Sequence, residues 1–106
     1  MKKIIKKQDI SQIDGVSKKW TFISNHGHVL IYLAQNEDAR VRDMADAVGI
    51  TERAIQIILS DFEAAHIIQK TKEGRRNRYR INHNIALRHP LEAHKSIGDL
   101  IAMIQK

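Results

Sequence analysis

The chain has 106 residues, no cysteine and a formal net charge of +6, with 18 lysine and arginine residues against 12 acidic ones. This length indicates one domain, and the missing cysteines exclude disulfides, thiolate metal sites and a cysteine nucleophile. No apolar run is long enough to cross a bilayer, and the N-terminal sequence MKKIIKKQDISQIDG lacks the apolar core of a secretory signal. We therefore expect a cytoplasmic protein with no membrane partner. The excess of basic residues favours a polyanionic binding partner.

The charge is distributed unevenly along the chain. Residues 1–19 contain six lysines and two acidic residues, whereas residues 20–69 contain three arginines and seven acidic residues. Residues 70–82 contain six basic residues and only Glu73 on the acidic side. The positive charge is thus concentrated in an N-terminal arm, which we predict to be flexible, and in one short internal segment.

Apolar residues at helical spacing predict two helices in the first half of the chain. The first covers residues 24–36, with Ser24 or Asn25 as its N-cap. A polar break follows, and residues 40–41 are predicted to form a brief extended piece. Residues 43–48 then form a short helix with one apolar face.

A tight turn and a longer helix come next. Gly49 is placed to end the short helix in left-handed geometry, and Thr51 is a good N-cap for a helix of about residues 51–65. The buried stripe of this third helix is predicted to consist of Ile55, Ile58, Leu59 and Phe62.

Residues 67–82 change from helical spacing to alternation, which predicts a β-hairpin. Tyr79 and Ile81 are expected to point inward, and Arg78 and Arg80 outward. Beyond this hairpin, Pro90 is predicted to stand at the first position of a C-terminal helix. The apolar stripe of that helix is Leu91, Ile97, Leu100, Ile101 and Ile104.

A short helix, a glycine turn and a capped longer helix within about twenty residues are typical of a helix-turn-helix. The segments VRDMADAVGITERAIQIILSDFEAAHII (41–68) and KTKEGRRNRYRIN (70–82) resemble the winged helix-turn-helix regulators of the MarR-like and ArsR-like superfamily, of the small one-domain prokaryotic type. HPLEAHKSIGDL (89–100) resembles the tail of such regulators. The resemblance implies an α+β, mainly α fold, with a winged helix over 20–82 and a C-terminal dimerisation helix over 83–106.

The resemblance also assigns roles to residues. The groove-facing positions of the recognition helix are Thr51, Glu52, Arg53, Gln56 and Ile57. The wing and phosphate-contacting positions are Arg40, Arg42, Lys72, Arg75, Arg76, Asn77 and Arg78. The dimer interface is expected to contain Trp20, Leu91, Ile97, Leu100, Ile101 and Ile104.

Two positions depart from the usual pattern of these regulators. Position 57 is often basic, and Ile57 there weakens contact with a DNA groove. Position 66 is usually glycine, and His66 suggests a different exit from the helix into the wing. The recognition helix itself is net acidic, so that the wing and the arm would have to supply most of the electrostatic affinity for DNA.

Each assignment has a plainer alternative. Arg53 and Gln56 can read guanine and adenine edges, or they can be solvated positions on an amphipathic helix. The wing arginines can bind phosphates, or they can protect an exposed strand edge from aggregation. The C-terminal stripe can pack on its own domain instead of on a partner. Thr51 is favoured as a cap and Glu52 as a partner of the helix dipole.

Other classes of function have little support in the sequence. The six histidines match no compact ligand spacing, so that we expect no metal, and we expect no cofactor. No phosphate-binding loop, nucleophile elbow or HExxH motif is present, which argues against an enzyme. We expect a homodimeric regulator, more often a repressor, that binds double-stranded DNA, with any small-molecule effector unidentified. A winged-helix module for protein or RNA is the alternative, since fold does not fix function.

Overall fold

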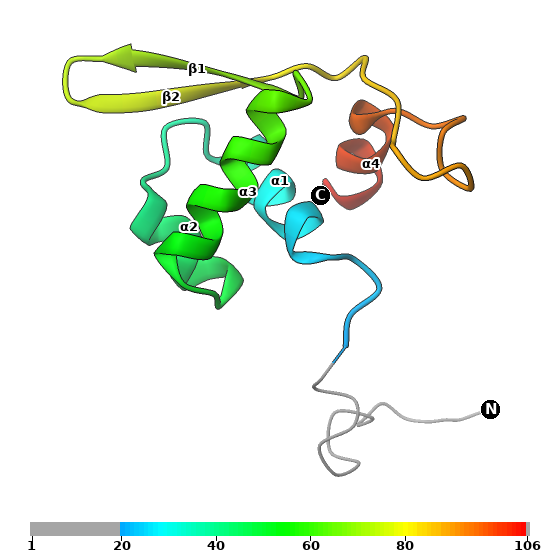
Figure 1. The fold of residues 1–106 in the computed structure, drawn as a ribbon, viewed down its shortest axis with the longest axis horizontal. Helices are drawn as coiled ribbons and strands as arrows, with labels where there is room; N and C mark the ends of the chain where they lie inside the picture. Colours follow the sequence, from blue (N-terminus) through cyan, green and yellow to red (C-terminus); the bar gives the residue numbers. More distant parts are fainter. Residues whose placement is uncertain (1–19, 106) are drawn as a thin grey trace, which may run out of the picture.

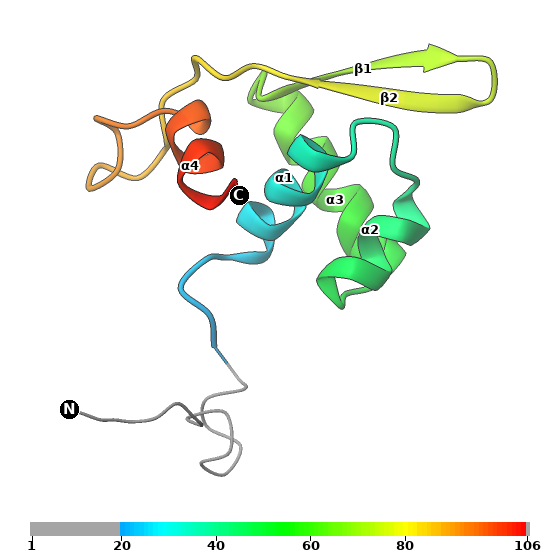
Figure 2. The same cartoon turned by 180° about the vertical axis from the view of Figure 1, so that it is seen from behind.

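The computed structural model describes residues 20–105, so that the basic arm predicted at residues 1–19 lies outside the described part. Three helices are followed by a hairpin and a last helix (Figure 1), which confirms the mainly α, winged-helix architecture. The hairpin points away from the last helix in both views (Figures 1 and 2). The elements are α1 (Asn25–Gln35), α2 (Val41–Val48), α3 (Glu52–Ala64), β1 (Ile68–Glu73), β2 (Arg76–Ile81) and α4 (Ile97–Ile104).

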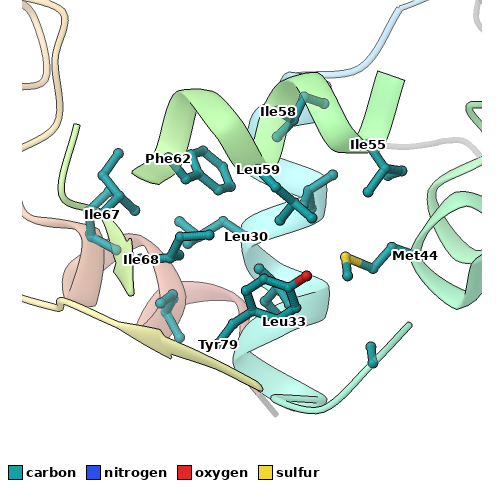
Figure 3. Close-up of a cluster of buried hydrophobic side chains, with 14 of the residues drawn as sticks. Leu30, Leu33, Met44, Ile55, Ile58, Leu59, Phe62, Ile67, Ile68 and Tyr79 are labelled. Atoms are coloured by element: carbon teal, nitrogen blue, oxygen red, sulfur yellow. The ribbon is translucent and has the colours of Figure 1, made fainter. Parts of the chain in front are cut away.

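One apolar cluster joins all the elements. Figure 3 shows side chains of α1 and α3 meeting between the two helices, with Met44 of α2 at the Ile55 end of the cluster. The predicted stripe of α3 is buried at all four positions, and Val29, Leu33, Met44 and Ile55 have no exposed surface. Burial of this kind is the main favourable term in folding, and it fixes how α2 and α3 are set against each other.

The helix starts follow local hydrogen bonds. Ser24 caps α1, because its hydroxyl accepts from the Gly27 N–H at 3.2 Å. The prediction for α2 was wrong by two residues, since the helix begins at Val41 and only Arg40 is extended. The Asp43 carboxylate accepts from the Arg40 N–H at 3.2 Å, which makes Asp43 the third residue of the helix and not its first.

Two left-handed residues end α2 and α3. Gly49 has a φ of 84° and donates to the Ala45 carbonyl at 2.8 Å, as predicted. His66 has a φ of 61°, which is the conformation that glycine adopts most easily. The Ile67 N–H then donates to Phe62 O at 2.8 Å and the His66 N–H to Glu63 O at 3.1 Å, which is the Schellman pattern. His66 thus adopts here the left-handed conformation that a glycine at position 66 would take.

The hairpin, hereafter the wing (residues 68–81), has a two-residue turn. Glu73 pairs with Arg76, and Gly74 has a φ of 64° in the turn between them. Tyr79 is buried and its neighbours Arg78 and Arg80 are exposed, as the alternation predicts. The outer edge of β2 is also bonded to the body, since the Tyr79 N–H donates to the Glu37 carbonyl at 3.1 Å.

The C-terminal segment differs from its prediction. The chain around Pro90 forms turns, and α4 begins only at Ile97, after the N-cap Ser96. A capping box defines this start, and the hydrogen bonds from Ser96 lower the pKa of Asp99. Gly98 lies so close to His83 that an added Cβ would meet its Cβ at 3.1 Å and its carbonyl at 3.2 Å. This close approach fixes the start of α4 against the turn at His83 that follows the wing.

The left-handed conformation of His66 generates a stability prediction. We expect His66→Gly to raise the free energy of unfolding by about 0.5–1 kcal/mol, because glycine relieves the Cβ strain at this φ at a smaller entropic cost. Urea denaturation measures the change. His66→Ala keeps the strain and serves as the control, which should not be stabilised. A glycine variant less stable than the wild type would mean that the exposed imidazole of His66 stabilises the fold by more than the left-handed backbone destabilises it.

Candidate nucleic-acid interface

The start of α3 is exposed and firmly capped. Thr51 precedes the helix, and its hydroxyl accepts from the Ala54 N–H at 3.0 Å. The five predicted recognition residues all keep exposed side chains, while the opposite face of the helix is buried. A capped helix start with free side chains is the part of a helix-turn-helix that enters a major groove. These five exposed residues are Thr51, Glu52, Arg53, Gln56 and Ile57.

Ile57 is the apolar residue in this exposed set. Its side chain is 52% exposed, although it lies on a helix whose other large aliphatic residues, Ile55, Ile58 and Leu59, are buried. The charged residues exposed along α3 are Arg53 and the acidic Glu52, Asp61 and Glu63. The helix therefore offers shape and hydrogen bonds to a duplex, and little net attraction for phosphate.

The turn between α2 and α3 determines where this face points. Met44 and Ala45 of α2 are buried, and Val48 and Ile50 are half-buried on either side of Gly49. Because these side chains pack on the cluster that also holds α3, the first turn of α3 has a fixed direction relative to the body. Arg40 and Arg42, at the start of α2, are both exposed.

The wing arginines differ in the residues that they contact. Arg75 lies in the turn, is exposed, and takes part in no salt bridge within residues 20–105. Arg76 donates from Nη2 to the Asp38 carbonyl at 2.6 Å, and its Nη2 lies 4.0 Å from a carboxylate oxygen of Asp38. Sequence reasoning missed this contact, because it joins residues 38 positions apart in the chain.

Arg78 is held by two carboxylates. Its Nη1 lies 3.3 Å from Glu73 Oε1, and its Nη2 lies 3.6 Å from Glu37 Oε1. The hydrogen bond and charge of Glu73, together with the charge of Glu37, raise the pKa of Arg78 above its usual value. The guanidinium is therefore always charged, and in this structure it lies between two carboxylates, one of which accepts a hydrogen bond from it.

The hairpin register separates the remaining wing residues. Lys72 pairs with Asn77 on the face that carries the buried Tyr79, whereas Arg76 and Arg78 alternate onto the opposite face. Lys72 is exposed and Asn77 is half-buried. The predicted wing set is thus brought to one hairpin, but it does not form a single surface.

The expected dimer residues fall into a buried group and an exposed group. Ile97 and Ile101 are each only 3% exposed and belong to the core of this chain, with Leu100 partly buried beside them. α4 uses Ile97 and Ile101 to pack within this chain, next to α1, so that these two side chains offer little surface to a partner. Trp20, Leu91 and Ile104 keep exposed surface, with Leu91 in the turns before α4.

An apolar surface lies near those exposed residues. Phe22 is 93% exposed, and its ring meets Trp20 edge to face with centroids 5.1 Å apart. Phe22 lines a groove of about 860 Å³ between the start of α1, the end of α3 and residues 87–100. The sequence indicates Trp20 and Phe22 as the start of packed structure, and the exposure of Phe22 contradicts this for its side chain.

The histidines do not gather into a metal site in the described part of the chain. No group of three or more potential metal ligands comes together within residues 20–105. His26 instead lies with Nε2 2.9 Å from Asp61 Oδ2, and its ring packs on Phe62 at a centroid distance of 5.8 Å. Over the same residues, none of the helices has the length and apolar character that a bilayer crossing requires.

The helix-turn-helix followed by a two-stranded wing defines a winged-helix fold. The chain is similar to MepR, a transcription regulator of the Staphylococcus aureus multidrug efflux pump MepA. The match has 21% identity and a TM-score of 0.50, and it covers 68% of this chain and 56% of MepR. This likeness confirms the fold. No protein family model and no curated protein sequence matches the chain.

The cap of α3 generates a testable prediction. We expect Thr51→Ala to lower the free energy of unfolding by about 0.5–2 kcal/mol, because the Ala54 N–H loses its acceptor. Thr51→Ser keeps the hydroxyl and is the matched control. Thermal unfolding of the three proteins measures the effect. Equal losses for alanine and serine would mean that the methyl group of Thr51 matters and the cap does not.

Proposed function

We propose that this chain is a sequence-specific regulator of transcription that binds double-stranded DNA in the cytoplasm and has no catalytic activity. The observation that carries the proposal is an exposed, capped recognition helix and an arginine-bearing wing joined directly to its other end. The likeness of the fold to MepR, itself a transcription regulator, supports it.

The two elements have different tasks in this proposal. Arg53 and Gln56 face base edges in the major groove, where arginine pairs with guanine and glutamine with adenine. The wing contacts the phosphate backbone, with Arg75 at its tip outside any salt bridge within residues 20–105, and Arg40 and Arg42 contact phosphates beside α2. Phosphate contacts set the register on the duplex, and base contacts give the sequence preference.

The regulator is proposed to act as a homodimer that represses by occupying its operator. Two copies of α3 about one helical turn apart fit a two-fold symmetric site of roughly 15–20 base pairs. The surface proposed for pairing contains Trp20 and Leu91 with the exposed edge of α4 around Ile104, while Ile97 and Ile101 support it from below. Exposed large apolar side chains of this kind are typical of a contact surface.

Selection of bound duplexes from a random pool tests the proposal most directly. Recovery of a common motif with two related half-sites would support a dimeric, sequence-specific DNA-binding protein. Gel shifts with random duplex, single-stranded DNA and structured RNA accompany it. Preference for RNA, or no nucleic-acid binding at all, would favour a protein or RNA module, for which the exposed Ile57 is suited.

The division of tasks predicts different mutant behaviour. We expect Arg75→Ala to weaken binding to all duplexes alike, and Gln56→Ala to relax the preference at one position of each half-site at a cost of about 1–3 kcal/mol. Binding of the wild type should fall ~10³-fold or more between ~50 and ~200 mM salt, if roughly six to ten phosphates are contacted. Fluorescence anisotropy measures the affinities of the two variants and the salt dependence of the wild type. Identical profiles for the two variants would contradict the assignment of roles.

The proposed dimer predicts a change in oligomeric state. Leu91 is 81% exposed in this chain, so that Leu91→Glu leaves the fold intact and places a charge on the pairing surface. We expect this variant to be monomeric in analytical ultracentrifugation at concentrations where the wild type is dimeric. Ile57→Glu introduces the same charge on α3 and should remain a dimer. A dimeric Leu91→Glu protein would place the interface elsewhere.

A further inference from the structure

The loop between α1 and α2 (residues 36–40) lies against the wing. Its Glu37 carbonyl accepts from the Tyr79 N–H, and its Asp38 carbonyl accepts from Arg76. The Glu37 and Asp38 side chains add ion pairs to Arg78 and Arg76. Two consecutive acidic residues therefore meet two wing arginines that alternate onto one face of β2.

The contacts by the loop carboxylates are exchangeable. The four side chains of the two pairs are 46–68% exposed, and exposed ion pairs of this kind are weak because water and salt screen them. A carboxylate and a phosphate present similar oxygen pairs to the planar donors of arginine. A duplex that reaches the wing therefore offers these arginines the same type of ligand.

We propose that Glu37 and Asp38 are intramolecular substitutes for DNA phosphates. Together with Glu73 at Arg78 and the Asp38 carbonyl at Arg76, they hold and orient the two arginines until a duplex takes over those donors. Glu37 and Asp38 are positioning residues in this scheme, since they act through the arginines. The inference rests on the proposed DNA binding and adds a regulated contact to it. DNA binding by the wing then becomes an exchange of carboxylate for phosphate at Arg76 and Arg78, while Arg75 binds without such competition.

The exchange has a measurable consequence for affinity. Because the loop carboxylates compete with phosphate, their removal strengthens binding and lets each arginine displace more counterions from the DNA. We expect Glu37→Gln to tighten binding to a random 20-base-pair duplex roughly two- to fivefold, and the Glu37→Gln/Asp38→Asn double variant roughly tenfold. The slope of log K against log salt should steepen by about one in the double variant.

Two controls separate this exchange from simpler effects. Glu92→Gln removes an equal charge from an exposed glutamate that lines the groove beside α4, and it should leave the affinity nearly unchanged. Glu37→Gln in an Arg78→Ala background tests whether the glutamate acts through the arginine. We expect the gain in affinity to disappear there, because the two substitutions affect one contact.

Fluorescence anisotropy over a salt series gives all of these values. The exchange would be overturned if Glu37→Gln gave no gain in affinity or a loss. It would also be overturned if the gain persisted without Arg78, because the glutamate would then simply repel DNA. The backbone bond from Tyr79 to Glu37 does not depend on the side chain, so that the variants should keep the wild-type melting temperature. If the wild type binds no duplex, the proposed function fails and this inference fails with it.

Discussion

The structure depends on the two-sided character of α3. One face of this helix, from Ile55 to Phe62, is buried against α1 and α2, and the other face is free from Glu52 to Ile57. The same helix begins at a side-chain cap and ends at a left-handed residue, so that both its direction and the start of the wing are fixed. Burial of one stripe therefore positions the exposed side chains and the hairpin at the same time.

The charge distribution is a second feature of the structure, because the basic wing lies against an acidic body. The winged-helix part carries more acidic than basic residues up to the wing, and two of those acidic residues lie directly against the wing arginines. A free protein with such pairs exposes less cationic surface than its sequence suggests. This arrangement limits non-specific attraction to polyanions without removing the arginines that a specific partner needs.

Periodicity alone predicted most of the fold. The stripes of α1 and α3 and the alternation at Tyr79 and Arg80 were correct, because each reflects burial on one face of a regular element. The start of α2 and the start of α4 were wrong, because the bond from the Arg40 N–H to Asp43 and the capping box of Ser96 and Asp99 decide them and apolar spacing does not. Local hydrogen bonds thus set the boundaries that the hydrophobic pattern leaves open.

The candidate site was less predictable from the sequence. The exposed residues of α3 and the wing were identified in advance, and their roles remain proposals. The pairing of Arg76 with Asp38 was not foreseen, because only the fold brings these distant positions together. Ile97 and Ile101 were assigned to an interface in preference to packing within the chain, since an apolar stripe looks the same in both cases.

The backbone bond between Tyr79 and Glu37 restricts how this chain can vary in evolution. Surface loops usually accept insertions, but here this bond ties the connection between α1 and α2 to the outer edge of β2. A residue added on either side of Glu37 would shift its carbonyl out of register and leave the Tyr79 N–H without an acceptor. Length changes are thus tolerated better at the hairpin tip around Gly74, and the inner loop keeps its length.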